Sequence, residues 1–149
     1  MDKLLEFIKN QKLITIASHN KDDIWVANVY FDSDEKGKIY FITSEDTKHA
    51  KMITENPKVA FSIAWFDSEN AKNRKGVQGL GICKIGNLKE TAIGISLLYK
   101  KFPDLHDILT IDWITKNVWK TRVWVIEPSF IKYFDDEIYG DDESEEFNF

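Results

Sequence analysis

The stretch from Ile39 to Pro57 holds the best candidate for chemistry in this 149-residue sequence. A run of strand-forming residues, Ile39 to Thr43, leads through a polar corner into a short predicted helix that ends at Pro57. The first backbone N–H groups of a helix have no partner within it and carry partial positive charge, so they bind a capping side chain or an anion. Either Asp46 or Thr47 is placed to act as the cap.

Lys48 and His49 fall in the first turn of this helix, where a cation opposes the helix dipole. That placement is understandable if a bound phosphate lies between Lys48 and the N–H groups. The alternative is a capped surface helix with Lys48 in water. The corner alone favours the alternative, because Glu45 and Asp46 already supply negative charge.

Two further polar residues lie within predicted strands. Asn28 is in the middle of the run from 24 to 31, and its amide either meets the polar edge of a ligand or faces water. Gln78 lies in a glycine-rich run from 76 to 85, on the same strand face as Leu80 and Ile82. Glycines in a strand are typical of a barrel bend or of a ligand close to the backbone.

The sequence predicts no catalytic side chain and no metal site. His19, His49 and His106 lie in three different elements without ligand spacing, and Cys83 sits in an apolar strand pattern rather than beside a base. Any reactive group would therefore come from a cofactor.

Composition indicates one domain with a distinct acidic end. Hydrophobic residues make up 43% of the chain, enough for a substantial core. The net charge of −5 depends on residues 135–149, which hold eight acidic residues and no basic one; the rest is about +3. We expect a barrel domain over 1–134 and an acidic tail over 135–149 that is solvated and disordered. Phe147 and Phe149 allow the alternative that the end of the tail packs against the domain.

Several partners are not expected. No apolar run approaches the roughly 18 residues of a membrane span, and the first six residues are too charged for a secretory signal, so a cytoplasmic protein is expected. The weakly basic body has no Lys/Arg cluster, which argues against nucleic acid.

The elements that must position these residues are mostly strands joined by short connections. This pattern predicts a mainly β protein, a six- or seven-stranded antiparallel barrel with flanking helices. The predicted helices cover residues 2–10, the segment before Pro57, and 87–102. The predicted strands are 13–17, 24–31, 38–43, 59–66, 76–85, 119–127, which Pro128 ends, and 130–134.

The order of these motifs resembles the FMN-binding split barrels related to pyridoxamine 5'-phosphate oxidase, over roughly residues 4 to 134. Within that superfamily the chain is similar to the UPF0306 (YhbP-like) group. The motifs that carry the resemblance are Tyr40-Phe41-Ile42-Thr43-Ser44, Thr47-Lys48-His49-Ala50, Glu55-Asn56-Pro57, Val59-Ala60-Phe61, Gly76-Val77-Gln78 with Gly79 and Gly81, and Tyr99-Lys100-Lys101-Phe102-Pro103.

The resemblance implies an FMN-binding homodimer with its flavins at the subunit interface. It implies a flavin-dependent oxidoreductase acting on an unidentified small molecule, or alternatively a non-catalytic flavin- or haem-binding or sensing protein. Vitamin B6 oxidase activity is not expected, because the chain ends in acidic residues where those enzymes use arginine and histidine. The implied FMN contacts are Thr47 and Lys48 at the phosphate, Thr43 and Ser44 beside the flavin, Ala27, Asn28 and Val29 facing the ring, and Gln78 reaching the cofactor.

Overall fold

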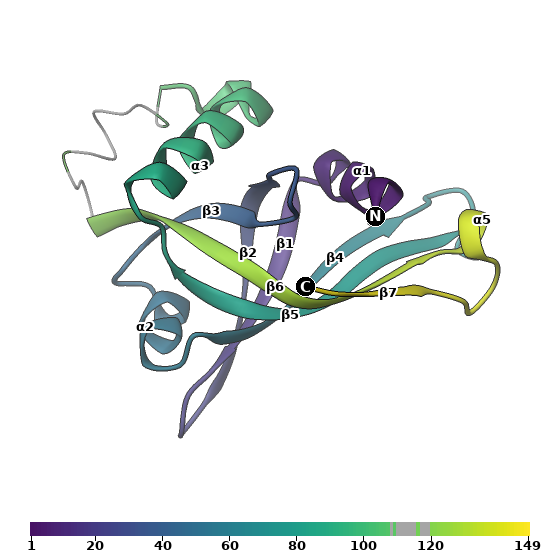
Figure 1. Ribbon diagram of the computed structural model, residues 1–149, viewed down its shortest axis with the longest axis horizontal. Coiled ribbons are helices and arrows are strands. Elements are labelled where there is room, and N and C mark those ends of the chain that lie inside the picture. Colours follow the sequence, from purple (N-terminus) through teal and green to yellow (C-terminus); the bar gives the residue numbers. More distant parts are fainter. Residues whose placement is uncertain (108, 110–115, 117–119) are drawn as a thin grey trace.

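The computed structural model describes residues 1–107, 109, 116 and 120–149. Its elements follow the order that the sequence predicts, with one additional strand near the C-terminus (Figure 1). They are α1 Asp2–Asn10, β1 Leu13–His19, β2 Ile24–Ser33, β3 Ile39–Ser44, α2 Lys48–Glu55, β4 Lys58–Phe66, β5 Arg74–Ile85, α3 Leu88–Lys101, the 3₁₀ helix η1 Pro103–Leu105, β6 Thr121–Asp135, α5 Asp136–Tyr139 and β7 Glu145–Asn148.

Six antiparallel strands close into a barrel, in the order β3-β2-β1-β4-β5-β6, and β6 pairs back onto β3. The first half of β6 pairs with β3, and the additional strand β7 pairs with the second half. The predicted fold class, a mainly β antiparallel split barrel with flanking helices, is confirmed. Among the described residues, no helix has the length and apolar character needed to cross a membrane.

The long strand β6 differs from the prediction of two strands separated by Pro128. Gly81 pairs with Pro128 and Leu80 pairs with Phe130, so Ser129 is an extra residue in β6. A bulge of this kind lets a strand continue through a proline, which has no N–H to donate. Trp119, the predicted start of this strand, lies outside the described residues.

Strand alternation fills the barrel with apolar side chains, as in β4, where every second residue from Val59 to Ile63 is buried. Gly79 faces this core opposite Phe61, and a Cβ there would lie 2.1 Å from Cζ of the Phe61 ring. At this position, core packing rather than a bend or a ligand therefore requires glycine. Leu4, Phe7 and Ile8 of α1 add to the same core.

The prediction of a disordered acidic tail is wrong, and the docked alternative is what the structure has. Residues 136–139 form α5, and β7 pairs with residues 130–133 of β6. Phe147 packs against the core, which supplies the apolar contact that a purely charged segment would lack. Figure 1 shows β7 running beside β6.

Candidate functional site

The corner between β3 and α2 is built as a helix cap, and Thr47 rather than Asp46 makes it. The Thr47 hydroxyl accepts a hydrogen bond from the Ala50 N–H at 3.3 Å and donates to the Ser44 carbonyl at 2.9 Å. Asp46 instead forms an ion pair with Lys120 at 3.2 Å. Among the described residues, nothing accepts a hydrogen bond from the backbone N–H groups of Lys48 and His49. The corner thus presents two backbone donors.

Lys48 reaches from α2 to the hairpin between β1 and β2. Its Nζ lies 2.6 Å from Oδ2 of Asp23 and 4.3 Å from the centre of the Trp25 ring. Both partners of the ion pair are about half exposed, and the hydrogen bond from Lys48 lowers the pKa of Asp23. An exposed pair of this kind is weak, so Lys48 remains available to another anion at the corner.

His49, to which the sequence assigned no role beyond its place in the first turn, points inward. Its Nε2 lies 2.9 Å from Oγ1 of Thr43 and 3.3 Å from Oγ1 of Thr47, and burial lowers its pKa. The ring therefore joins the end of β3 to the start of α2 in its neutral form. Trp124 fixes the same strand end by donating to the Thr43 carbonyl at 3.2 Å.

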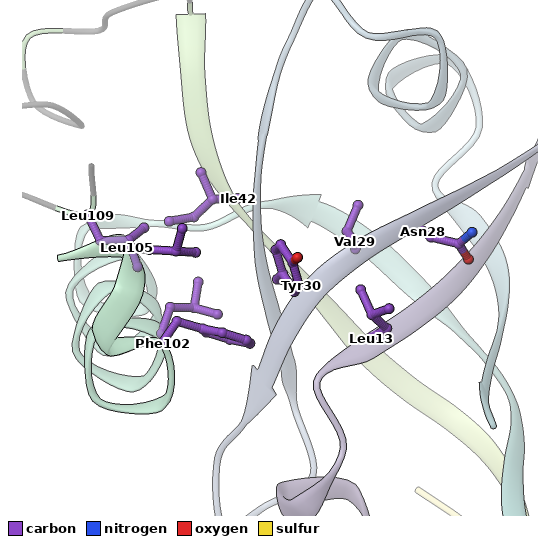
Figure 2. Close-up of a pocket in the computed structure, with 9 residues that line it drawn as sticks. Leu13, Asn28, Val29, Tyr30, Ile42, Phe102, Leu105 and Leu109 are labelled. Atoms are coloured by element: carbon purple, nitrogen blue, oxygen red, sulfur yellow. The ribbon is translucent and has the colours of Figure 1, made fainter. Parts of the chain in front are cut away.

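Beside β2 lies a cavity of about 430 Å³ that is mainly apolar (Figure 2). This volume falls within the range of small-molecule sites, about 300–1,000 Å³. Two residues of the predicted ring-facing segment, Asn28 and Val29, form part of its wall. The remaining lining residues are Leu13, Tyr30, Ile42, Leu98, Phe102, Leu105 and Leu109.

The far wall of this cavity comes from α3 and η1, for which the sequence predicted no contact with a ligand. The end of α3 is held to β2 by an ion pair between Lys101 Nζ and Asp32 Oδ1 at 3.0 Å. Their side chains are only 11% and 13% exposed, and burial lowers the pKa of Lys101. Next to this pair the rings of Tyr30 and Phe102 lie 5.2 Å apart, centre to centre.

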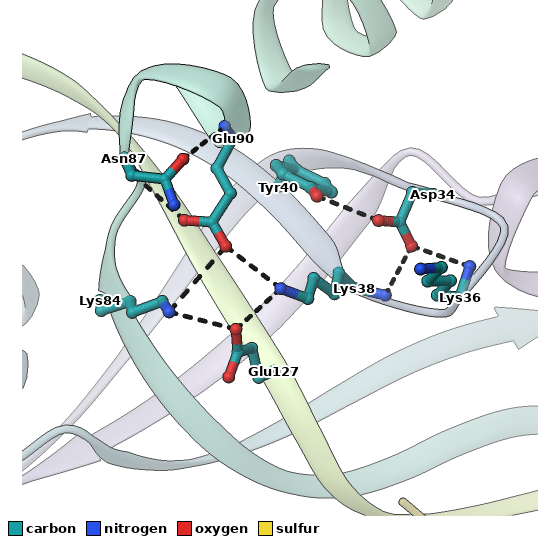
Figure 3. A network of polar contacts seen from close by, with 8 residues as sticks. All are labelled: Asp34, Lys36, Lys38, Tyr40, Lys84, Asn87, Glu90 and Glu127. Carbon is teal, nitrogen blue, oxygen red and sulfur yellow. Dashed lines mark hydrogen bonds and ion pairs between the residues drawn. The ribbon is translucent and has the colours of Figure 1, made fainter. Parts of the chain in front are cut away.

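The start of α3 is held by a network of alternating charges (Figure 3). Lys38 Nζ lies 3.1 Å from Oε1 of Glu90 and 2.8 Å from Oε1 of Glu127, and Lys84 Nζ lies 3.1 Å from the same Glu127 oxygen. The bonds from the two lysines lower the pKa of Glu127. Asn87 and Glu90 also form a reciprocal cap. With two lysines and two glutamates the network is balanced, so it positions α3 rather than binding a charged ligand.

Gln78 does not join the other predicted contacts within one chain. It is exposed on β5 and lines a separate cavity of about 230 Å³ together with Arg74 and Lys132. Strand register nevertheless connects it to Asn28, through a row formed by Asn28, Thr15, Ser62 and Gln78 on β2, β1, β4 and β5. At about 4.8 Å per strand, three spacings separate the ends of this row by about 14 Å.

The other predicted contacts fall into two groups. Asn28 and Val29 lie at the apolar cavity, and the Thr15 hydroxyl donates to Oδ1 of Asn28 at 2.6 Å. Thr43, Ser44, Thr47 and Lys48 lie at the corner before α2. Ala27 precedes Asn28 in β2, where it is half-buried and paired with Ile16.

Neither metal-binding nor thiol chemistry finds support in the part of the chain that the structure describes. Those residues contain no group of three or more His, Cys, Asp or Glu side chains able to hold a metal ion. Cys83 is buried, which raises the pKa of its thiol to about 12. Such a thiol is inert near neutral pH.

A family model described as pyridoxamine 5'-phosphate oxidase matches residues 1–90. The chain belongs to the pyridoxamine 5'-phosphate oxidase family. A UPF0306 protein of Campylobacter jejuni is 31% identical to this chain over 103 residues, which cover 68% of this chain and 72% of that protein. The matched segment of the family model includes the corner, β2 and the cap of α3.

Solved structures of similar fold include two whose names refer to haem. A haem-binding protein from Mycobacterium smegmatis superposes with a TM-score of 0.72 at 13% identity, covering 93% of this chain and 53% of that one. HutZ, the haem storage protein of Vibrio cholerae, gives 0.68 at 16% identity, covering 99% and 92%. At these identities, the likeness of this pyridoxamine 5'-phosphate oxidase-family chain to them is one of fold.

Proposed function

We propose that the protein binds flavin mononucleotide, with the ring beside Asn28 and Val29 and the phosphate at the corner before α2. The observation that carries this proposal is the pair of backbone N–H groups of Lys48 and His49, which find no acceptor among the described residues. Anions bind at such helix starts. Lys48 adds a mobile positive charge, and the apolar cavity suits a ring system. Membership of the pyridoxamine 5'-phosphate oxidase family supports the same ligand.

A homodimer would complete this site. The outer face of the sheet carries apolar residues that are each at least 40% exposed, and exposed apolar patches mark interaction surfaces. They come from β1, β2 and β5. Strand β4 lies between β1 and β5, and its Ala60 is in the register row that links Val26 through Ala17 to Leu80. These residues are Leu13, Val26, Tyr30, Leu80 and Ile82. A second copy of the chain is the proposed occupant of this face, because Leu13 and Tyr30 also line the apolar cavity.

The register row explains why Gln78 is remote from the other contacts in one chain. A two-fold axis running along the strands between β1 and β4 exchanges the two ends of the row. Gln78 of the second copy then lies over Asn28 of the first. In this arrangement each flavin site takes its phosphate corner and cavity from one subunit and its glutamine from the other.

The proposed activity is that of a flavin-dependent oxidoreductase acting on an unidentified small molecule. Bound flavin would supply hydride or electron transfer, and the protein would bind and orient the ring and exclude water from one face. Oxidation of pyridoxamine phosphate is not proposed, because the C-terminal segment carries acidic residues where the vitamin B6 oxidases use arginine and histidine.

Titration with FMN, followed by the loss of flavin fluorescence, tests the phosphate site. Lys48→Met should weaken binding about 10- to 150-fold, since a hydrogen bond to a charged group contributes about 1.5–3 kcal/mol. Asp23→Asn should tighten binding, because it frees Lys48 from its ion pair. Lys51→Met removes an exposed cation from the same helix and serves as the matched control. Equal affinity in Lys48→Met and Lys51→Met would remove Lys48 from the phosphate role.

Haem binding without turnover is the second candidate, and the two haem-related structures of similar fold favour it. Haem iron takes an axial ligand from His, Cys, Met or Tyr. Among the described lining residues of the apolar cavity, only Tyr30 is of such a type. Haem added to the protein should then show a shifted Soret band, and Tyr30→Phe should abolish the shift, whereas a protein that binds only flavin should leave the band of free haem unchanged.

A further inference from the structure

The acidic C-terminal segment lies on a cationic part of the outer sheet face. Arg74, at the start of β5, donates from Nε to Asp136 Oδ2 at 3.0 Å and from Nη2 to Asp142 Oδ1 at 2.9 Å. These bonds raise the pKa of Arg74. By strand alternation the neighbouring Lys75 points to the opposite face of the sheet, where it is paired with Asp135 at 3.5 Å and with Glu137. The segment therefore supplies the counter-charges of this surface.

A cavity remains between the segment and the strands beneath it. It measures about 230 Å³, and its floor includes Arg74, Gln78 and Lys132. Lys132 stands opposite Glu146 in the register of β6 and β7. Asp142, Glu143 and Ser144 form the side contributed by the segment. Two cations and an amide thus face a small space that carboxylates of the same chain close.

The closing segment is held weakly. β7 has four residues, of which only Phe147 is half-buried, and it is an edge strand. The backbone turns before it at two residues with positive φ, Gly140 at 95° and Asp142 at 64°, and the latter conformation is unfavourable for a residue with a side chain. The Asp142 carboxylate is 86% exposed, so its bond to Arg74 is screened by water. Short edge segments with few buried contacts belong to the low-stability end of a fold.

We propose that Arg74, Lys132 and Gln78 form a binding site for a polyanion such as a pyrophosphate or phosphate ester. The acidic segment from 141 to 149 is a strap that occupies this site and is displaced by such a ligand. Guanidinium and ammonium groups beside an amide donor are suited to phosphate oxygens. The segment's carboxylates satisfy the same groups when no polyanion competes. This inference rests on the contacts of the segment and does not depend on flavin binding.

The strap covers the surface that the proposed dimer uses at Gln78. Displacing it would change both the charge of that face and its access to a second copy. Polyanion binding and strap opening can be measured without flavin, so their failure and the failure of the flavin proposal are distinguishable.

The test combines calorimetric titration with pyrophosphate and hydrogen exchange of the amides of residues 145–148. Removing the strap charges in Asp142→Asn/Glu146→Gln should tighten pyrophosphate binding about tenfold, because the exposed ion pair of Asp142 with Arg74 and the negative charge of Glu146 opposite Lys132 no longer compete. Asp141→Asn removes the same kind of charge from a residue that makes no ion pair among the described residues, and it should change affinity little. Arg74→Met should abolish binding. Saturating pyrophosphate should speed exchange in β7 of the wild type, whereas sodium chloride at matched ionic strength should not.

Three results would overturn the proposal. One is the absence of pyrophosphate binding in Asp142→Asn/Glu146→Gln. Another is equal tightening in Asp141→Asn, which would indicate a general charge effect. The third is unchanged exchange of the β7 amides at saturating pyrophosphate.

Discussion

The ion pair between Lys101 and Asp32 allows a quantitative test of how α3 is docked to the barrel. Breaking a buried pair by removing one partner costs about 3–5 kcal/mol, because the other charge is left without compensation. Asp32 Oδ1 also accepts from the Ser33 N–H at 2.8 Å, which places the expected cost of Lys101→Met at the lower end, about 3 kcal/mol. The methionine retains an apolar stem above Phe31, where the lysine Nζ lies 4.6 Å from the ring centre.

The matching double variant should recover most of this loss. Burial lowers the pKa of Lys101 although Asp32 opposes the change, and removing both charges also removes the cost of burying them. Asp32→Asn/Lys101→Met should therefore lie within about 1 kcal/mol of the wild type, since the amide oxygen can still accept from Ser33.

Urea unfolding followed by tryptophan fluorescence measures these free energies. Lys100→Met, on the exposed side of the same helix turn, is the control and should stay within about 0.5 kcal/mol of the wild type. A Lys101→Met variant as stable as Lys100→Met would refute the argument, and so would a double variant that is no more stable than the single one.

Three further predictions concern the corner and the core. The free energy of unfolding should fall as the pH drops below 6.5, because His49 binds a proton there in the unfolded chain but, with its pKa lowered by burial, not in the folded one. In urea unfolding, His49→Asn should reduce this loss of stability. The same pH dependence in His49→Asn as in the wild type would show that another group causes it. Gly79→Ala should cost about 1–3 kcal/mol in thermal unfolding through its collision with Phe61, and an unchanged melting temperature would contradict that packing. Thr47→Ala should lose about 1 kcal/mol by removing the cap of α2, whereas Thr47→Ser should retain most of it.

Local patterns allowed most of the barrel to be predicted. Alternation identified β4 and β5, and the helix that ends before Pro57 has the expected boundary. Capping chemistry acts over three residues, so the role of Thr47 as one of two candidates could be stated from sequence.

Contacts between distant residues could not be predicted in this way. The apolar cavity depends on α3 packing beside β2, and the bond that fixes it joins residues 69 positions apart. The pairing of Lys48 with Asp23 depends on the hairpin between β1 and β2 folding back to α2. The segment from 135 to 149 was predicted to be solvated from its like charges, whereas cations from β5 neutralise it in the fold.

The prediction that the strand ends at Pro128 is wrong for a different reason. A proline within a run argues for the end of a strand, and the extra residue Ser129 that absorbs it becomes visible only when β6 is aligned with β5. The register of β5, β4, β1 and β2 likewise connects Gln78 with Asn28, which single-strand patterns cannot do.

Equilibrium titration of the purified protein with FMN decides whether the corner and the apolar cavity form a flavin site. We expect saturable loss of flavin fluorescence with one FMN per chain, weakened in Lys48→Met and kept in Lys51→Met. Flavin fluorescence that remains undiminished at saturating protein, in wild type and Asp23→Asn alike, would contradict it.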